Sequence, residues 1–127
     1  MNKIKHQYKS GYFYIGYKPN AKKYGIIKIG ETFNLKKRIT NIKQFEPFEP
    51  LAHLNIITSN KCALWLVEAV VRFKLSQYEG LKHKGLDHFS YNIITGTGKT
   101  QAEQVAKYAI SIAQQACEMF GIAYATE

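Results

Sequence analysis

The sequence predicts an α/β fold of the α+β type, in which a small three-stranded antiparallel sheet is flanked by helices. Three observations support this class. The chain has 127 residues, of which 46% are hydrophobic, so it can bury one core. Near its start, two aromatic and β-branched runs are joined by a polar turn, and apolar segments at helical spacing follow. We therefore expect residues 1–127 to form a single domain.

Two strands near the start are expected to form a hairpin. Residues 10–17 (SGYFYIGY) and 24–30 (YGIIKIG) are rich in residues that favour strands, and the polar stretch between them has the length of a hairpin turn. The third strand is expected at residues 51–58, after a proline-containing connector that excludes helix. Residues 86–94 are compatible with a further short strand.

Three helices are expected, ending near residues 41, 78 and 120. Their candidate first residues or N-caps are, in chain order, Thr32 or Asn34, Ser59 or Asn60, and Lys99 or Thr100. The middle helix is apolar nearly all round, which predicts that it is buried. The last helix, over residues 100–120, carries a seam of small and apolar residues that can either pack on the core or form a homodimer. The seam comprises Ala102, Val105, Ala109, Ile112, Ala116 and Met119.

The net charge of +9 is concentrated at the start of the chain. Residues 1–43 carry eleven basic and one acidic side chain (11 − 1 = +10), and residues 44–127 carry seven basic and eight acidic ones (7 − 8 = −1). A basic segment interleaved with aromatic residues favours binding to nucleic-acid phosphates, although such a face can also serve solubility alone. The candidate nucleic-acid contacts are Lys18, Lys22, Lys23, Lys36, Lys37 and Lys43.

Several function classes are disfavoured. The sequence contains no apolar run of membrane-spanning length and begins without a signal-peptide pattern, so we expect a cytoplasmic protein with no membrane partner. Residues 96–100 (GTGKT) resemble the end of a phosphate loop, but Ile93 stands where its first glycine is required, so no nucleotide cofactor is expected. With one Asp and eight Glu, a site that holds two metal ions would be difficult to build.

Glu68 is the most unusual residue, because it places a carboxylate within the apolar stretch 63–71. Burying an ionised carboxylate is costly unless it is paired or binds a cation. Arg72 follows four residues later and can pair with Glu68 on the same helix face. From the residues alone, a metal ligand and a simple ion pair are equally supported.

The chain resembles the GIY-YIG nuclease family over residues 11–93. The resemblance is carried, in order, by Tyr12-Phe13-Tyr14, Lys28-Ile29-Gly30, the segment Asn34-Leu35-Lys36-Lys37-Arg38-Ile39, Glu68 on its apolar helix and, more loosely, Tyr91-Asn92. Tyr12 stands where the family has Gly, and Lys28 stands where it has Tyr. This pattern looks like a phage and bacterial branch whose strand reads Lys-Ile-Gly.

The resemblance implies a metal-dependent endonuclease that hydrolyses DNA phosphodiester bonds, one strand per active site, in a bacterial or phage-infected host cell. Tyr14 would activate water, Arg38 would neutralise charge on the transition state, and Glu68 would hold one Mg²⁺ or Mn²⁺ ion. Lys28 and Asn92 complete the implied catalytic set. The expected partner is double-stranded DNA. The alternative is a catalytically inactive basic module that binds nucleic acid.

Overall fold

The computed structural model describes residues 10–19 and 24–125, which form an α+β fold built on one six-stranded antiparallel sheet. The elements are, in chain order, β1 (Ser10–Lys18), β2 (Tyr24–Thr32), α2 (Leu35–Phe45), β3 (Glu49–Ile57), α3 (Lys61–Ser76), β4 (Lys82–His83), β5 (His88–Asn92), α4 (Lys99–Phe120) and β6 (Tyr124–Ala125). In the sheet the strand order is β4-β5-β2-β1-β3-β6.

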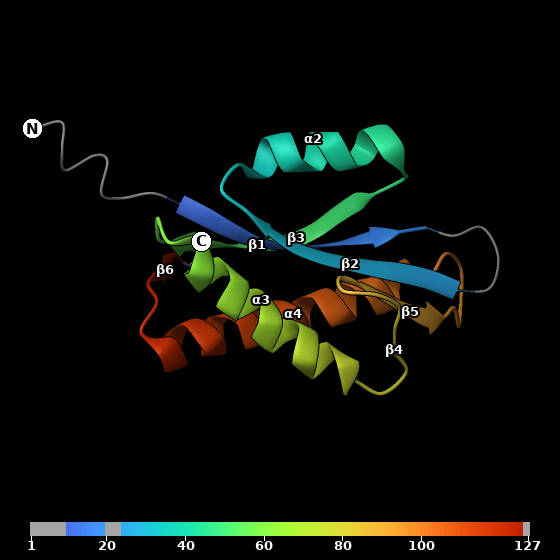
Figure 1. Ribbon diagram of the computed structural model, residues 1–127. Coiled ribbons are helices and arrows are strands. Elements are labelled where there is room, and N and C mark those ends of the chain that lie inside the picture. The colour runs from blue at the N-terminus through green and yellow to red at the C-terminus, as the bar shows by residue number, and fades with distance from the viewer. Residues whose placement is uncertain (1–9, 20–23, 126–127) are drawn as a thin grey trace, which may run out of the picture.

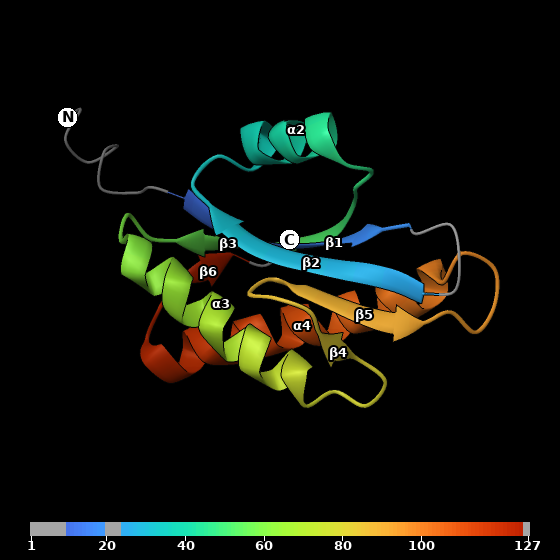
Figure 2. The same ribbon diagram turned by 45° about the vertical axis from the view of Figure 1, so that its right-hand side comes forward.

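The helices cover the two faces of the sheet unequally. Helix α2 lies alone on one face, whereas α3 and α4 lie together on the other (Figures 1 and 2). The main core fills the space between the sheet and the α3–α4 pair, and a smaller cluster of Tyr14, Ile42 and Phe48 lies under α2. The face under α2 is therefore only partly covered, which leaves room for a site.

The expectation of a three-stranded sheet was wrong in number but right for its centre. The hairpin of β1 and β2 and the third strand, β3, are antiparallel neighbours as expected. Strand β5 extends the sheet beyond β2, and two-residue strands, β4 and β6, complete its edges. Strands this short carry no periodic pattern, so tertiary pairing alone defines them.

The expectation that the middle helix is buried holds for only one side of it. Helix α3 buries Leu64, Val67, Val71 and Leu75, but Trp65 is 55% and Phe73 60% exposed. Because the sheet and α4 contact only one side of this helix, its apolar outer side remains at the surface.

Helix α4 begins and ends as expected and packs on the core through its small-residue seam. Five of the six seam residues are buried, and Met119, near the end of the helix, is exposed. The homodimer stays a prediction. Among the helices that the structure describes, none combines the length and the apolarity needed to cross a membrane.

The pairing of β1 with β2 places Tyr14 directly opposite Gly30. A Cβ atom at Gly30 would overlap the Cζ and Oη atoms of the Tyr14 ring, so the ring lies directly over this glycine. Only a residue without a side chain allows a phenol to cross β2 at this point.

We predict that Gly30→Ala lowers the free energy of unfolding by about 1–3 kcal/mol, because the added methyl group overpacks the space under the ring. In a Tyr14→Ala background the ring is absent, and the same glycine change should have no steric cost. Urea denaturation of the four proteins measures this coupling. An equal cost in both backgrounds would show that the ring does not lie over Gly30.

Candidate active site at the free edge of β2

Tyr14 and Arg38 are joined by a hydrogen bond between β1 and α2. The Nε–H of Arg38 donates to the Tyr14 Oη at 3.2 Å. The Tyr14 ring is 2% exposed and packs edge-on against Phe48. Asn34 fixes the start of α2, since its side chain accepts a hydrogen bond from the backbone N–H of Lys37. The first turn of α2 therefore holds Arg38 over the phenol.

The environment of Tyr14 favours the protonated phenol at neutral pH. Burial raises the pKa of Tyr14, while the hydrogen bond and charge of Arg38 act against this rise. The negative charges of Asp87 and Glu68 also raise this pKa. Two carboxylates from distant parts of the chain thus act electrostatically on the same phenol.

Lys28, which the resemblance aligns with the second tyrosine of the family pattern, is 6% exposed and ion-paired. Its Nζ lies 3.0 Å from Asp87 Oδ2, and the other carboxylate oxygen, Oδ1, lies 2.7 Å from His88 Nδ1. Although burial opposes it, the hydrogen bond and charge of Lys28 hold the pKa of Asp87 below its ordinary value. Because Lys28 is paired with His88 in the sheet register, the start of β5 positions this group.

His88 connects this pair to Lys18. The Nζ of Lys18 lies 3.3 Å from His88 Nε2 and 2.7 Å from Glu46 Oε2. Burial lowers the pKa of His88, and the charges of Lys28 and Lys18 lower it further, against the raising effect of Asp87. Lys18, expected to contact nucleic acid, is therefore engaged in an ion pair within the protein.

Glu68 is ion-paired with Arg72, and the charges of Glu31 and Asp87 affect its pKa. Arg72 Nη2 lies 3.3 Å from Glu68 Oε1, and the Glu68 side chain is 14% exposed. Burial raises the pKa of Glu68 most, and the negative charges of Glu31 and Asp87 raise it further, whereas Arg72 lowers it. The ion pair expected from sequence is present, and Glu68 also belongs to a group of acids.

Glu31 lies at the end of β2, where that strand loses its partner. The last bond on this side joins the Ile29 N–H to the Asp87 carbonyl, and beyond it this edge of β2 is unpaired within the described part of the chain. The Oε1 of Glu31 is 2.7 Å from Lys61 Nζ, whereas its Oε2 is buried and has no hydrogen-bond partner among the described residues. We call this region, defined by Tyr14, Lys28, Glu31, Arg38, Glu68 and Asp87, the β2-edge site.

Asn92 is not brought to the β2-edge site. It lies four residues beyond His88 on β5, or about 13 Å along the strand. It pairs with Tyr24 in the sheet register, and its carbonyl accepts a hydrogen bond from Gln101. Of the implied catalytic residues, Tyr14 and Arg38 are hydrogen-bonded, Lys28 is ion-paired with Asp87, and the charge of Glu68 acts on Tyr14, whereas Asn92 lies apart from them.

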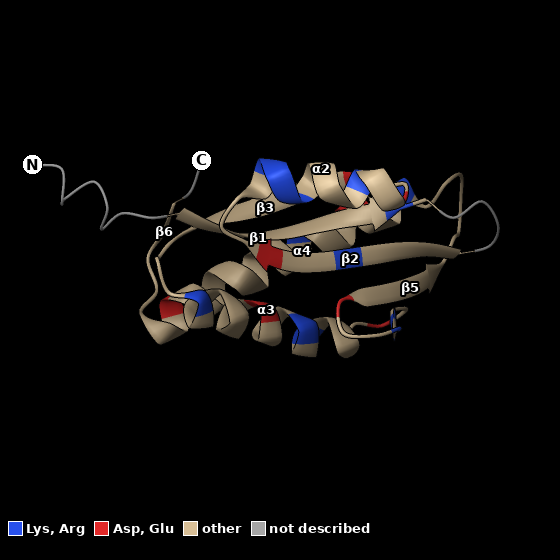
Figure 3. Ribbon diagram, turned by 45° about the horizontal axis from the view of Figure 1, so that its top comes forward, with Lys and Arg blue, Asp and Glu red and all other residues tan. Residues whose placement is uncertain are grey.

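The candidate nucleic-acid contacts fall mainly on α2. Lys36, Lys37 and Lys43 are exposed on this helix, which contains no acidic residue (Figure 3). Lys22 and Lys23 lie outside the described residues. Helix α2 thus forms a basic wall beside the phenol.

Carboxylates are the groups of this site that could hold a divalent ion. Within residues 10–19 and 24–125, no three or more His, Cys, Asp or Glu side chains are arranged to hold a metal ion together. Mg²⁺ is usually bound through one or two carboxylates together with waters and substrate phosphates. Glu68, which is also paired with Arg72, and the Oε2 of Glu31 are the carboxylate oxygens that could contribute such ligands.

Glu31 and Asp87 were not among the site residues expected from the sequence, although both carried a signal. Glu31 is the sole acid among the first 43 residues, and Asp87 is the sole aspartate of the chain. Because acidic residues are scarce in this basic protein, each of them is a candidate for the functional site. Their proximity to Glu68 depends on strand pairing and could not be inferred from spacing.

We predict that Asp87→Asn lowers the free energy of unfolding at pH 7 by about 1–3 kcal/mol, because it leaves the buried Lys28 ammonium without its counter-charge. The native pKa of Asp87 is depressed, so this contribution is complete above about pH 3.9 and is lost as the pH falls through the lower native value. Denaturation of both proteins at pH 7 and in acid tests this, and the difference should shrink in acid.

Glu49→Gln is the matched control, since Glu49 forms an ion pair with Lys99 in which both side chains are nearly half exposed. This change should leave stability nearly unaltered at either pH. A difference between native protein and Asp87→Asn that persists unchanged in acid would contradict the role given to the carboxylate charge.

Comparison with known families adds one finding. Residues 11–120 match the family model of the T5orf172 domain, a span that includes every residue of the β2-edge site. Comparisons with curated proteins and with solved structures gave no significant match. The family match gives no direct assignment to the GIY-YIG nucleases. With most of its length covered by this model, the chain belongs to the T5orf172 domain family.

Proposed function

We propose that this protein is a metal-dependent endonuclease of the GIY-YIG type, which hydrolyses DNA phosphodiester bonds one strand per active site. One observation supports this proposal most directly: the Tyr14 ring lies over Gly30 and accepts a hydrogen bond from Arg38. At this position the charges of Glu68 and Asp87 affect the pKa of the phenol. A phenol, a guanidinium and carboxylates around one position are suited to phosphate hydrolysis.

Tyr14 and Arg38 would act as one unit in this reaction. Arg38 uses its Nε–H on the phenol, and its exposed guanidinium keeps further donors in a planar fork that suits phosphate oxygens. Burial raises the pKa of Tyr14, and the hydrogen bond and charge of Arg38 oppose this rise. Once deprotonated, the phenol would accept a proton from the attacking water. The water oxygen bonds to phosphorus, the bond to the leaving sugar oxygen breaks, and that oxygen takes a proton from solvent.

Lys28 would supply a fixed positive charge where the family pattern has its second tyrosine. Its pairing with Asp87 keeps the ammonium in one place and makes its burial tolerable. A fixed ammonium can attract a phosphate oxygen, and the proposal assigns it this electrostatic role alone. Proton transfer in this chain would therefore rest on Tyr14.

Glu68 is the residue that would hold the divalent ion. When bound, Mg²⁺ or Mn²⁺ would polarise the phosphate and stabilise the leaving oxygen. The raised pKa of Glu68, caused by burial and by the neighbouring acids, is the property that a nearby cation would relieve. One carboxylate ligand agrees with the acid-poor composition of the chain.

We predict that the protein converts supercoiled plasmid to the open circular form with Mg²⁺ and not with chelator. Glu68→Gln and Arg38→Ala should each slow nicking by about a hundredfold or more, the usual cost of removing one contact to the transition state. Gel electrophoresis of time courses measures the rate. Glu103→Gln and Lys107→Ala are matched controls, since each removes the same kind of charge from an exposed position on α4.

Nicking by Glu68→Gln at the native rate would exclude Glu68 from the reaction. If the native protein never nicks DNA but binds it in a salt-sensitive manner, the non-catalytic binding module would replace the endonuclease. Denaturation curves of each variant separate lost chemistry from lost folding.

A further inference from the structure

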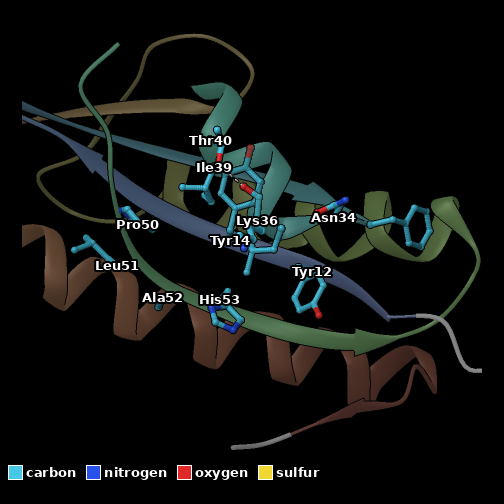
Figure 4. A pocket seen from close by; sticks show the side chains of 12 residues that line it. Tyr12, Tyr14, Asn34, Lys36, Ile39, Thr40, Pro50, Leu51, Ala52 and His53 are labelled. Carbon is cyan, nitrogen blue, oxygen red and sulfur yellow. Dashed lines mark hydrogen bonds between the residues drawn. The ribbon is translucent and has the colours of Figure 1, made fainter. Parts of the chain in front are cut away.

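A groove that shares only Tyr14 with the β2-edge site lies between α2 and β3. Its volume is about 750 Å³, within the range of pockets that bind small organic groups. Ile39 from α2 and Leu51 from β3 contribute apolar walls, and Tyr14 forms part of the lining (Figure 4). The proposed hydrolysis leaves this groove without a role.

Two aromatic rings stand at one end of the groove. Tyr12 from β1 and His53 from β3 lie side by side, with ring centroids 5.9 Å apart and planes at 72° (Figure 4). His53 is exposed and Tyr12 is half-buried, so both rings are held by the sheet and still reach solvent. Rings fixed in this way are suited to stacking against another flat, aromatic group.

The positive charge beside the groove favours an anionic ligand. The wall formed by α2 contributes Lys36 to the lining and carries Lys37 and Lys43 without any acid. An apolar, aromatic slot beside a basic helix complements a nucleotide, which combines a flat base with a phosphate. A base within a duplex is stacked on both faces, so only an unpaired one can enter the slot.

We propose that this groove binds an unstacked nucleobase of single-stranded DNA, with the adjoining phosphates along α2. The position of the cut relative to the bound base rests on the proposed function, because Tyr14 lines the groove and also belongs to the β2-edge site. On that basis the preferred substrate has at least one unpaired nucleotide next to the scissile phosphate. A branched or gapped duplex would meet this requirement.

Fluorescence anisotropy in the presence of chelator tests the groove without cleavage. The probes are a labelled oligothymidylate of about 12 nucleotides, within the usual range of single-strand sites, and a blunt duplex of the same length. Tyr12→Ala and His53→Ala should each weaken binding of the single strand by about fivefold or more, the lower end for loss of one stacked base. Duplex binding should be unchanged. Lys36→Ala should weaken both, because it removes a phosphate contact.

Phe73→Ala is the matched control, since it removes an exposed aromatic ring from α3, on the opposite face of the sheet. It should bind both probes as the native protein does. Native affinity for the single strand in both Tyr12→Ala and His53→Ala would overturn the proposal, as would an equal loss for single strand and duplex. Thermal unfolding of each variant identifies any that fails to fold. If one of the two groove variants does not fold, the binding measured for the other tests the proposal.

The outcomes also separate this proposal from the endonuclease. If the protein binds single strands through Tyr12 but never nicks plasmid, the nucleobase-binding proposal stands and the endonuclease proposal fails. If the protein nicks plasmid but binds single strands equally well without the Tyr12 or His53 ring, the endonuclease proposal stands and the nucleobase-binding proposal fails.

Discussion

The contact between the Tyr14 ring and Gly30 is the constraint on which the rest of the candidate site depends. The register of β1 and β2 places these residues opposite each other, and the absence of a side chain at Gly30 lets the ring cross β2. The phenol thereby meets Arg38 from α2 and the charges of acids beyond the strand. A slip of one residue would turn Tyr14 to the opposite face and abolish this arrangement.

Charge pairing explains how a basic protein gathers three acids in one region. Each acid has a cationic partner from another position in the chain: Glu31 with Lys61, Glu68 with Arg72, and Asp87 with Lys28. These pairs offset the repulsion between the carboxylates, yet Glu68 still has a raised pKa and Glu31 keeps one buried oxygen without a partner in the described part of the chain. Each carboxylate of the site is therefore paired, and burial, rather than the lack of a partner, is the largest cause of the raised pKa of Glu68.

Local signals in the sequence predicted the elements that carry the site, and they failed where tertiary contacts decide. Asn34 and Asn60 cap α2 and α3 as expected, because capping is a contact within a few residues. The apolar sequence of α3 did not reveal its exposed side, since periodicity reports which residues are apolar and not how much of the helix its neighbours can cover. Strand β6, with two residues, exists only because β3 offers it an edge.

The sequence by itself determined the central hairpin, the three helices, the basic character of α2 and the identity of Tyr14, Arg38 and Glu68 as residues of interest. Each of these follows from local spacing, composition or an ordered motif. Only the tertiary structure decided that Asp87 holds Lys28, that Glu31 stands near Glu68, and that Asn92 lies apart. Those relations depend on the register between β2 and β5 and on the packing of α3 against the sheet, and contacts between distant segments leave no pattern in a single sequence.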